Sequence, residues 1–380
     1  MTSDGNDELI AFGVVWSTSE VPTIEDNDGY TEDNYVTGTE FLSEFTNLAP
    51  GTTYYFRAYA TNSIGAGYGG IYSFTTDKGE LHIGGDFTLS PKVYDGEVNA
   101  IISNNNLTLE SIFSDHNVEL SPVAVFNDPD AGTGKDVFID QDLTLLSGPD
   151  AVRYELIYDT DTPKTTADIT PKELTIDGIF TALSREYDGT VDAEIGTDNL
   201  TLEGIVGTDE VGLTGVVVKF DSHTVGTGKT VSILEASLVG VHSDNYTLSL
   251  TGAPTAQADI SPRVLTIGGS FTVKPKEYSG DIIADIDDNS LTLIGIVASE
   301  EVSLADGMIG FASSQVGTGI EVTIVGVDLG GTHKDNYTVS LTGAPTSTGD
   351  IYAKELNIGG SFTAQSKTFD GTTSATMVDN

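Results

Sequence analysis

An internal repeat of about 91 residues constrains this chain more than any other feature of its sequence. The twelve residues that begin at Asp244 return at Asp335, 91 residues later, with one difference. Self-similarity at a fixed period is the signature of a repeat architecture, and it gives this chain three whole units and the beginning of a fourth. A triplet of an aromatic residue, Asp or Ser, and Gly marks every unit, at Tyr94–Gly96, Tyr187–Gly189, Tyr278–Gly280 and Phe369–Gly371.

Each unit opens with the same pattern, Leu-x-Ile-x-Gly followed by Phe. The pattern begins at Leu81, Leu174, Leu265 and Leu356. Both the N-terminal segment and the last unit look incomplete, so we expect the chain to be part of a longer polypeptide. The predicted domains are the N-terminal segment 1–77, repeat 1 (78–171), repeat 2 (172–262), repeat 3 (263–353) and the beginning of a fourth repeat (354–380).

The local pattern is that of β-strands throughout. Apolar residues alternate with polar ones in short runs separated by Gly, Asn, Asp and Pro, as in strands joined by turns. The alternation slips by one residue within repeats 2 and 3, which would turn all later side chains to the other face unless the backbone absorbs it. We therefore predict a β-bulge or a corner between sheets at Ile233–Leu234 and at Ile324–Val325. No apolar run keeps the period of a helix over three turns, so helix should be scarce.

The composition excludes several classes of protein. The chain has 16 basic and 58 acidic residues, a net charge of −42, so nucleic acid and anionic membrane surfaces would repel it. It has no cysteine, which removes disulfides and thiolate metal sites. No apolar run reaches the roughly 18 residues of a membrane-spanning helix, so no membrane insertion is expected in this segment. Residues 1–10 lack the basic start and the apolar stretch of a secretion signal.

An acidic loop in the N-terminal segment is the best candidate for a metal site. Carboxylate oxygens clustered beside a glycine are ligands that suit Ca²⁺, although the EF-hand spacing fails because Ile24 stands at the first ligand position. A calcium site and an ordinary solvated loop are both open interpretations. The candidate ligands around Gly29 are Asp26, Asp28, Glu32 and Asp33.

We interpret the aromatic-Asp-Gly triplets as turns rather than as catalytic sites. Asp95, Asp188 and Asp370 precede glycine, where aspartate caps a turn and glycine takes a positive φ. The third copy has Ser279, which can still cap a turn but is a poor base or ligand. Basic residues recur near the triplets and between the units, where we expect them to neutralise carboxylates or cap carbonyl groups: Lys92, Arg185, Lys276 and Lys367, and Lys78, Lys172, Arg263 and Lys354.

Other recurring residues also have structural interpretations. The Gly-Thr-Gly segments at 132–134, 226–228 and 317–319 lack the spacing of a phosphate-binding loop and are predicted to be hairpin turns. His242 and His333 are equivalent but belong to separate units, so they should not share a metal. No Ser/His/Asp or Cys/His arrangement repeats, and no catalytic residue or cofactor site is predicted beyond the calcium candidate. Four Asn-x-Thr sequons recur because strand starts recur, at Asn106, Asn199, Asn245 and Asn336.

The N-terminal segment resembles a fibronectin type III module. The resemblance rests on Leu48-Ala-Pro-Gly51, Tyr54, the run from Arg57 to Gly65, and the closing Tyr72–Thr76. It implies that the Tyr54 hydroxyl bonds to the backbone of the corner that precedes it. Because few residues precede Trp16, the module is incomplete or its first strand is very short.

The 91-residue units resemble the YDG-type (MBG-like) repeats of large bacterial surface proteins. The basic-x-aromatic-Asp-Gly segment, the Leu-Thr-Leu run, the Val-Gly-Thr-Gly segment and Asp-Asn-Tyr-Thr carry the resemblance. Together with the strand pattern it implies an all-β fold of tandem β-sandwich-like domains in an extended row. It also implies a structural stalk segment of a secreted bacterial cell-surface adhesin or extracellular filament, one that spaces and presents a binding region. The expected location is extracellular, at the cell surface, and the expected partners are the neighbouring repeats, surface glycans or other cells.

Two alternative functions stay open. The repeats could bind polysaccharide or ice through a regular array of exposed threonine residues, and Thr108, Thr201 and Thr292 recur in register. The chain could also be an accessory region of a secreted enzyme whose catalytic domain lies elsewhere in the polypeptide.

Overall fold

The computed structural model describes residues 7–33 and 40–378. The first six residues, on which part of the signal prediction rests, lie outside the described residues. The chain divides into two compact units whose boundary falls inside repeat 2. Unit 1 is Met1–Leu174, Leu202–Gly212 and Leu238–Ser249, and unit 2 is Thr175–Thr201, Leu213–Ser237 and Leu250–Asn380.

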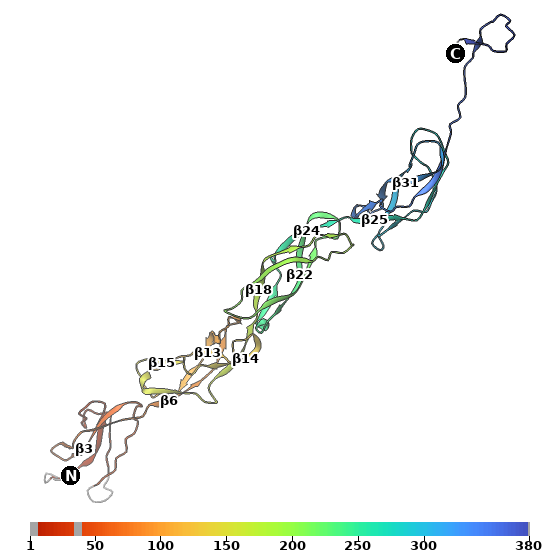
Figure 1. The fold of residues 1–380 in the computed structure, drawn as a ribbon. Coiled ribbons are helices and arrows are strands. Elements are labelled where there is room, and N and C mark those ends of the chain that lie inside the picture. Colours follow the sequence, from red (N-terminus) through yellow and green to blue (C-terminus); the bar gives the residue numbers. More distant parts are fainter. Residues whose placement is uncertain (1–6, 34–39, 379–380) are drawn as a thin grey trace. The chain divides into compact units, whose positions relative to one another are not determined.

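The fold is all-β, as the sequence predicts. In the described ranges the elements are β-strands and three short 3-10 helices, with no α-helix among them (Figure 1). The strands form separate small sheets that recur from one repeat to the next. Within the described part of the chain, no helix has the length and hydrophobicity needed to cross a membrane.

The N-terminal segment of unit 1 forms one five-stranded sheet, in the order β2-β1-β3-β4 with β5 also paired to β3. Val15 and Trp16 on β1 are buried, and the Trp16 ring lies 5.1 Å from that of Phe45. The Ala49 N–H donates a hydrogen bond of 2.9 Å to the Tyr54 hydroxyl, so the bond predicted for Tyr54 is present. The strands are β1 (Ala11–Ser17), β2 (Gly29–Tyr30), β3 (Thr53–Thr61), β4 (Ala66–Tyr68) and β5 (Tyr72–Thr75).

Repeat 1, also in unit 1, has sheets in the orders β11-β6-β16, β10-β7, β12-β15 and β8-β17-β14-β13-β9. Its first strand, β6, pairs in parallel with the late strand β16, so the repeat closes on itself. The elements are β6 (Gly79–Gly84), β7 (Phe87–Leu89), β8 (Lys92–Val93), β9 (Asn99–Ala100), β10 (Ile102–Asn105), β11 (Thr108–Glu110), β12 (Glu119–Ser121), β13 (Ala124–Phe126), β14 (Gly132–Ile139), β15 (Leu145–Ser147), η1 (Ala151–Arg153), β16 (Tyr154–Ile157) and β17 (Lys164–Thr170).

Repeat 2 has sheets in the orders β20-β18-β23 and β19-β24-β22-β21. The strand β19 pairs in parallel with β24, as β8 does with β17 in repeat 1. The elements are β18 (Lys172–Ala182), β19 (Arg185–Glu186), β20 (Ile195–Glu203), β21 (Gly212–Phe220), β22 (Gly226–Val239), η2 (Ser243–Asn245), β23 (Tyr246–Ser249) and β24 (Thr255–Ser261).

Repeat 3, in unit 2, has sheets in the orders β29-β25-β32, β26-β28 and β27-β33-β31-β30. Two short strands, β34 and β35, follow and pair with each other. The elements are β25 (Arg263–Gly268), β26 (Phe271–Val273), β27 (Lys276–Glu277), β28 (Ile286–Asn289), β29 (Thr292–Ile294), β30 (Ser303–Phe311), β31 (Gly317–Gly330), η3 (Lys334–Asn336), β32 (Tyr337–Ser340), β33 (Ser347–Tyr352), β34 (Thr363–Ala364) and β35 (Met377–Val378).

The apolar residues that recur from repeat to repeat form the cores. Burying one large aliphatic or aromatic side chain contributes roughly 1.5–3 kcal/mol. The buried cluster of repeat 1 also includes Leu174 and Tyr246 of repeat 2. The core of repeat 3 includes residues of all three of its sheets: Ile267, Phe271, Ile309, Phe311, Val322, Ile324 and Ile351.

The β-bulge predicted in repeat 3 is confirmed. Ile309 pairs with Ile324 and Met308 pairs with Gly326, so Val325 is the extra residue on β31. Val325 is 49% exposed, while Val327 beyond it packs against the core. The bulge therefore returns the later part of the strand to its inward register. The equivalent bulge at Ile233–Leu234 stays a prediction.

Candidate functional site at the repeat junctions

The aromatic-Asp-Gly triplet of repeat 1 forms a tight turn after β8. The Asp95 carboxylate accepts a hydrogen bond of 2.9 Å from the Glu97 N–H and lies 2.7 Å from Lys92 Nζ. Burial alone raises the pKa of Asp95, but the bonds from Lys92 and Glu97 outweigh it and hold the pKa below its usual value. Gly96 has a φ of +81°, a conformation that glycine adopts without strain. The predicted turn is confirmed.

The cation two positions before the triplet forms an ion pair in the other copies as well. Arg185 pairs with Asp188, and Lys367 lies 2.8 Å from Asp370. This confirms that these cations neutralise neighbouring carboxylates. The ion pairs formed by the described residues do not include the second predicted set, Lys78, Lys172, Arg263 and Lys354.

Repeat 3 keeps the same turn although Ser279 replaces the aspartate. Lys276 pairs with Asp281, which stands two residues after Ser279, and the Asp281 carboxylate accepts a 2.9 Å hydrogen bond from the Ile283 N–H. Hydrogen bonds from Lys276, Ser279 and Ile283 lower the pKa of Asp281 to about 2. In repeat 3 the carboxylate therefore stands at Asp281 rather than within the triplet, and it still accepts a backbone hydrogen bond and pairs with the lysine.

The tyrosine of the first triplet is buried against repeat 2. The Tyr94 hydroxyl donates a 2.8 Å hydrogen bond to the Asp209 carboxylate, and the Tyr246 hydroxyl donates one of 2.6 Å to the same oxygen. The Tyr246 hydroxyl also accepts a 2.9 Å bond from the Val206 N–H. The rings of Tyr94 and Tyr246 meet edge to face, with their centroids 5.3 Å apart. We name Tyr94, Asp209 and Tyr246 the first tyrosine–carboxylate cluster.

The charges of the first cluster are adjusted to this arrangement. Burial alone raises the pKa of Asp209, but hydrogen bonds from Tyr246 and Tyr94, with the nearby His242, outweigh it and lower the pKa. Burial and the bond to Asp209 raise the pKa of Tyr94, and the same causes raise that of Tyr246 to about 12. The cluster is therefore most stable with an ionised carboxylate and two neutral tyrosines.

An equivalent cluster joins repeats 2 and 3. The hydroxyls of Tyr187 and Tyr337 both donate to the Glu300 carboxylate, and the Val297 N–H donates a 3.0 Å bond to the Tyr337 hydroxyl. The two rings are again edge to face, at 5.5 Å. Burial and the bond to Glu300 raise the pKa of Tyr187. Tyr187, Glu300 and Tyr337 are the second tyrosine–carboxylate cluster.

The glycine of the triplet lets the next repeat approach. A Cβ atom on Gly96 would lie 3.0 Å from a methyl carbon of Val206, and one on Gly189 would lie 2.8 Å from a methyl carbon of Val297. Separations this short are tighter than ordinary van der Waals contact. The glycine is therefore needed both for the turn and for the junction.

Two of the Asn-x-Thr asparagines lie at these junctions. Asn245 ends η2 and accepts a 2.7 Å bond from the Ala131 N–H, while its amide donates to Asp130 at 3.0 Å. Asn336 ends η3 and accepts a 3.1 Å bond from the Val225 N–H. Both side chains are buried, which supports the structural interpretation of these two sequons. Three recurrent motifs thus meet at each junction: the triplet, the segment before Gly-Thr-Gly, and Asp-Asn-Tyr-Thr.

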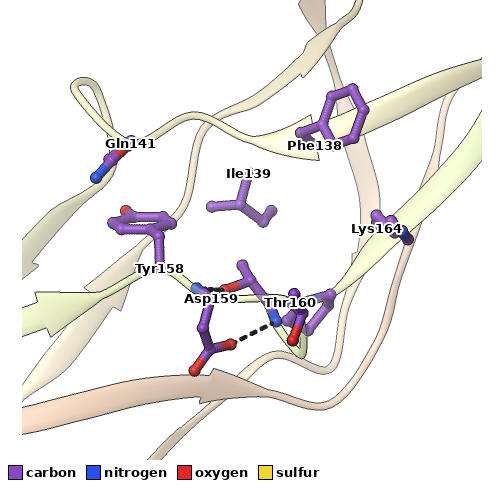
Figure 2. Close-up of a pocket in the computed structure, with 9 residues that line it drawn as sticks. Phe138, Ile139, Gln141, Tyr158, Asp159, Thr160 and Lys164 are labelled. Atoms are coloured by element: carbon purple, nitrogen blue, oxygen red, sulfur yellow. Dashed lines mark hydrogen bonds between the residues drawn. The ribbon is translucent and has the colours of Figure 1, made fainter.

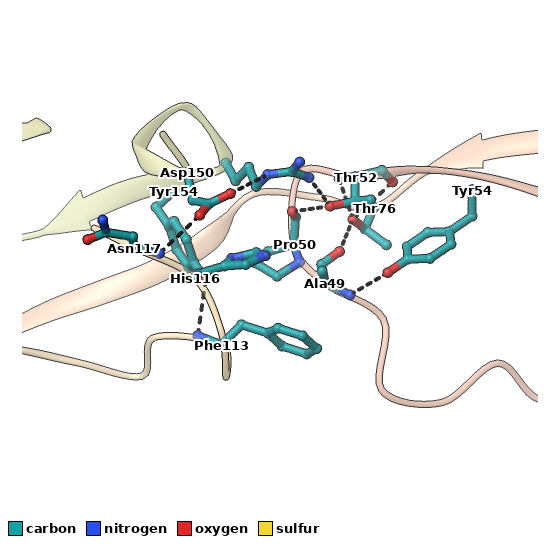
Figure 3. Close-up of polar contacts among 11 residues, drawn as sticks. Ala49, Pro50, Thr52, Tyr54, Thr76, Phe113, His116, Asn117, Asp150 and Tyr154 are labelled. Carbon is teal, nitrogen blue, oxygen red and sulfur yellow. Dashed lines mark hydrogen bonds and ion pairs between the residues drawn. The ribbon is translucent and has the colours of Figure 1, made fainter. Parts of the chain in front are cut away.

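The N-terminal segment contacts repeat 1 with different chemistry (Figure 3). Arg153, at the position of Asn245, donates to the Thr52 hydroxyl. His116, at the position of Asp209, has its Nδ1 2.7 Å from the Tyr154 hydroxyl. That hydroxyl accepts a 3.0 Å bond from the Phe113 N–H, as in the other repeats. The tyrosine is constant, and its polar partner is not.

The two carboxylates of the clusters are the functional residues that sequence reasoning missed. Asp209 and Glu300 are two of 58 acidic residues, they differ in length, and they lie in loops. A weak signal exists, because each stands three residues after a valine, Val206 or Val297, and the two valines are 91 residues apart.

The four predicted calcium ligands are described, but no metal site is evident. Asp28 accepts a 2.6 Å hydrogen bond from the Thr18 N–H, and Asp33 accepts one of 2.7 Å from the Thr31 hydroxyl. Among residues 7–33 and 40–378, no group of three or more His, Asp or Glu residues is arranged to hold a metal ion. The calcium site at Asp26, Asp28, Glu32 and Asp33 stays a prediction.

A shallow pocket in repeat 1 lies beside Phe138 and Tyr158 (Figure 2). Its acidic residue, Asp159, is already engaged, because its carboxylate accepts a 2.9 Å bond from the Asp161 N–H and lies 2.9 Å from His82 Nδ1. The pocket is therefore a product of the local turn. The ring of Phe138 does not recur, since Ser232 and Thr323 stand at the equivalent positions of repeats 2 and 3.

The Gly-Thr-Gly segments are not hairpin turns, which corrects the sequence prediction. They lie at the beginning of long strands, where the register against the last strand shifts. Gly134, Gly228 and Gly319 have φ values of +62°, +59° and +63° there. An aspartate of the paired strand binds each glycine N–H, at 2.7, 2.7 and 2.9 Å. The Gly-Thr-Gly segments are therefore β-bulges. At each one the glycine has a positive φ, and its N–H binds an aspartate side chain instead of a carbonyl group of the paired strand.

The remaining candidates lie apart from the junction clusters. Nδ1 of His242 and of His333 each accepts a bond from the N–H of a neighbouring glutamate, at 3.0 and 3.2 Å, so their equivalence is structural. Thr108, Thr201 and Thr292 are exposed on their strands. The polysaccharide- or ice-binding alternative requires this exposure, but ordinary strands also have exposed threonines.

Comparison with known families agrees with the internal repeat. The model of the YDG domain matches residues 78–163, 170–256 and 261–348. No curated protein matches the chain.

Proposed function

Because this chain belongs to the YDG domain family through three consecutive matches, we propose that it is a structural stalk segment of a secreted bacterial cell-surface adhesin or extracellular filament. Its role is to space and present a binding region. The proposal gives it no catalytic activity. Its partners are the neighbouring repeats, and beyond them surface glycans or other cells.

The observation that carries the proposal is the tyrosine–carboxylate cluster, which is built twice from the same positions. Domains in one chain move relative to each other by default unless their contact is large and apolar. Here each contact adds an edge-to-face ring pair, worth about 0.5–1.5 kcal/mol, and hydrogen bonds to a charged group, worth about 1.5–3 kcal/mol each. Such directional contacts resist rotation at the junction, which is what a spacer needs.

We further propose that the N-terminal segment is a fibronectin type III-like module. Its support is the bond between the Ala49 N–H and the Tyr54 hydroxyl, together with the strands β1, β3 and β5 where the resemblance expects them. In this proposal the module is one more bead of the stalk. Its contact with repeat 1 through Arg153 and Thr52 fixes that bead to the repeats.

The proposed location is extracellular, at the cell surface. A net charge of −42 keeps a long chain soluble and discourages lateral association. The absence of cysteine means that the stalk would depend on packing and junction contacts rather than on disulfides.

Small-angle scattering of the full chain tests the spacer role. A single globule of this length has a radius of gyration of about 21 Å, and we expect a clearly larger value. The double variant Asp209→Ala, Glu300→Ala should scatter as a more flexible particle with the same strand content. A wild-type radius near that of one globule would overturn the proposal. Tight, specific binding of the full chain on a glycan array would favour the polysaccharide-binding alternative instead.

A further inference from the structure

The triplet of repeat 3 has the same backbone geometry as those that form clusters. The φ of its glycine, Gly280, is +85°, against +81° for Gly96 and +82° for Gly189. The N–H of Tyr278 donates a 2.9 Å bond to the carbonyl of Tyr352. Tyr94 and Tyr187 make the same bond, also at 2.9 Å, to the last strand of their own repeats. The turn is therefore fully formed.

Its outer surface is nevertheless uncovered. Tyr278 is 37% exposed, whereas Tyr94 is 4% and Tyr187 is 0% exposed. A Cβ atom on Gly280 would meet nothing within 4 Å, where the equivalent glycines each meet a valine. Val316, at the position of the Val225 whose N–H binds Asn336, is 52% exposed. The residues equivalent to those through which repeats 1 and 2 contact the next repeat are thus present in repeat 3, and they are exposed to solvent.

The segment after repeat 3 begins the same fold. Leu356 and Ile358 repeat the opening pattern, but they are 84% and 103% exposed. Their equivalents Leu265 and Ile267 are 0% and 4% exposed, because later strands of repeat 3 cover them. In residues 354–378, β34 and β35 pair as β26 and β28 do in repeat 3, whereas Leu356 and Ile358 lie outside any strand.

We propose that the surface formed by Tyr278, Gly280 and Val316 is a docking site for a further YDG repeat. That repeat would carry a carboxylate at the position of Glu300 and an Asn-Tyr pair at the positions of Asn336 and Tyr337. A second copy of this chain is a poor occupant, because its repeat 1 has His116 in place of the carboxylate and its equivalent face contacts Thr52 through Arg153. The inference deepens the proposed function and rests on it.

The test completes a fourth repeat on the full chain. Asn380 is equivalent to Asn289, so the residues of repeat 3 from 290 to 353 can follow it directly and supply copies of Glu300 and Tyr337. Nitration of Tyr278 by tetranitromethane, followed by mass spectrometry, should be at least tenfold slower in the extended chain than in chain 1–380. Tyr187 serves as the internal reference and should stay protected in both.

The matched control changes the appended copies of Glu300 to Ala and of Tyr337 to Phe. Tyr278 should then regain most of its reactivity while the appended strands keep their hydrogen-exchange protection. A second extension, made with residues 199–262 of repeat 2, supplies an Asp209 copy in place of glutamate and should protect Tyr278 equally.

Undiminished nitration of Tyr278 beside a folded appended repeat would overturn the inference. An appended repeat that stays unfolded in both versions would also overturn it, because the docking repeat must be completed by these same strands. Failure of the stalk function is separate, since it appears in the scattering of chain 1–380, in which only the beginning of a fourth repeat is present.

Discussion

The two junctions within unit 1 have the same backbone and different chemistry. Tyr154 of repeat 1 and Tyr246 of repeat 2 each follow a short 3-10 helix and each accept a hydrogen bond from an N–H about 40 residues earlier in the chain. Toward the N-terminal segment, the partner of the tyrosine is His116, and toward repeat 1 it is Asp209. The constant tyrosine builds the end of each repeat. Asp209 also binds Tyr94 of the repeat before it, whereas the bond of His116 stays within its own repeat.

Removing the carboxylate should have the largest effect. In Asp209→Ala the hydroxyls of Tyr94 and Tyr246 lose their buried acceptor, and an unsatisfied buried polar group costs about 1–3 kcal/mol. We expect the free energy of opening at the Ala131 and Val206 amides to fall by about 2–4 kcal/mol, measured by hydrogen exchange.

The matched variant His116→Ala at the other junction should cost only about 1 kcal/mol at the Phe113 amide, because it removes a contact within one repeat. Equal losses for the two variants would mean that the carboxylate has no special part in joining repeats.

A second comparison separates the two uses of the triplet glycine. Gly189→Ala meets both the strain of positive φ and the methyl carbon of Val297 at 2.8 Å, so we expect a loss of about 2–4 kcal/mol. Gly280→Ala meets only the strain and should lose about 1–2 kcal/mol. Both glycines lie in unit 2, and urea denaturation of the two variants compares them directly. A larger loss for Gly280→Ala would contradict the close approach seen at Gly189.

The first cluster should respond to pH at both ends. The pKa of Asp209 is lowered in the folded chain, so its contribution is present above the unfolded value near ~3.9 and is lost as the pH falls below it. The pKa of Tyr246 is raised to about 12, so its contribution is complete below the unfolded value near ~10 and disappears as the pH rises to about 12. Urea midpoints of unit 1 should drop in both windows.

The acid part of this loss should be smaller in Asp209→Asn, which has no carboxylate to protonate. An unchanged acid response in that variant would assign the response to other carboxylates.

Tyr54→Phe tests the N-terminal segment by itself. The Ala49 N–H would lose its acceptor, at a cost of about 1 kcal/mol, seen as a lower urea midpoint for Trp16 fluorescence. The control Tyr72→Phe, at a residue 66% exposed, should leave the midpoint unchanged.

The smallest expected effect is that of calcium. If Asp26, Asp28, Glu32 and Asp33 bind Ca²⁺, calorimetry should show one weak site. Its dissociation constant should be about 10⁻⁴–10⁻³ M, as in extracellular modules. Asp26→Asn with Asp33→Asn should abolish it. Absence of heat in the wild-type titration would remove the calcium prediction.

The strand pattern and the turn chemistry could be predicted because they depend on neighbours in sequence. Alternation places Val322 and Ile324 in the core whatever lies beyond them, and an aspartate before glycine caps its own turn, as Asp95 does. The sequence predicts hairpins at the Gly-Thr-Gly bulges because a positive φ at glycine suits both structures, and only the pairing with the last strand distinguishes them.

The junctions could not be predicted, because their partners are far apart in the chain. Tyr94 and Asp209 are separated by 115 residues, and nothing near either residue reveals the other. The ion pair of Lys276 with Asp281, instead of with the triplet position occupied by Ser279, could not be predicted either. The lysine side chain is long enough to reach both positions, and the sequence does not show which one it contacts.

The sequence by itself determined an all-β chain of repeated units, since periodicity and turn residues act locally and recur with the repeat. Only the tertiary structure decided that Tyr94 and Tyr187, the tyrosines of the first two triplets, belong to the following repeat as much as to their own. The physical reason is that a buried hydroxyl must find an acceptor, and which acceptor it finds depends on the packing of one repeat against the next.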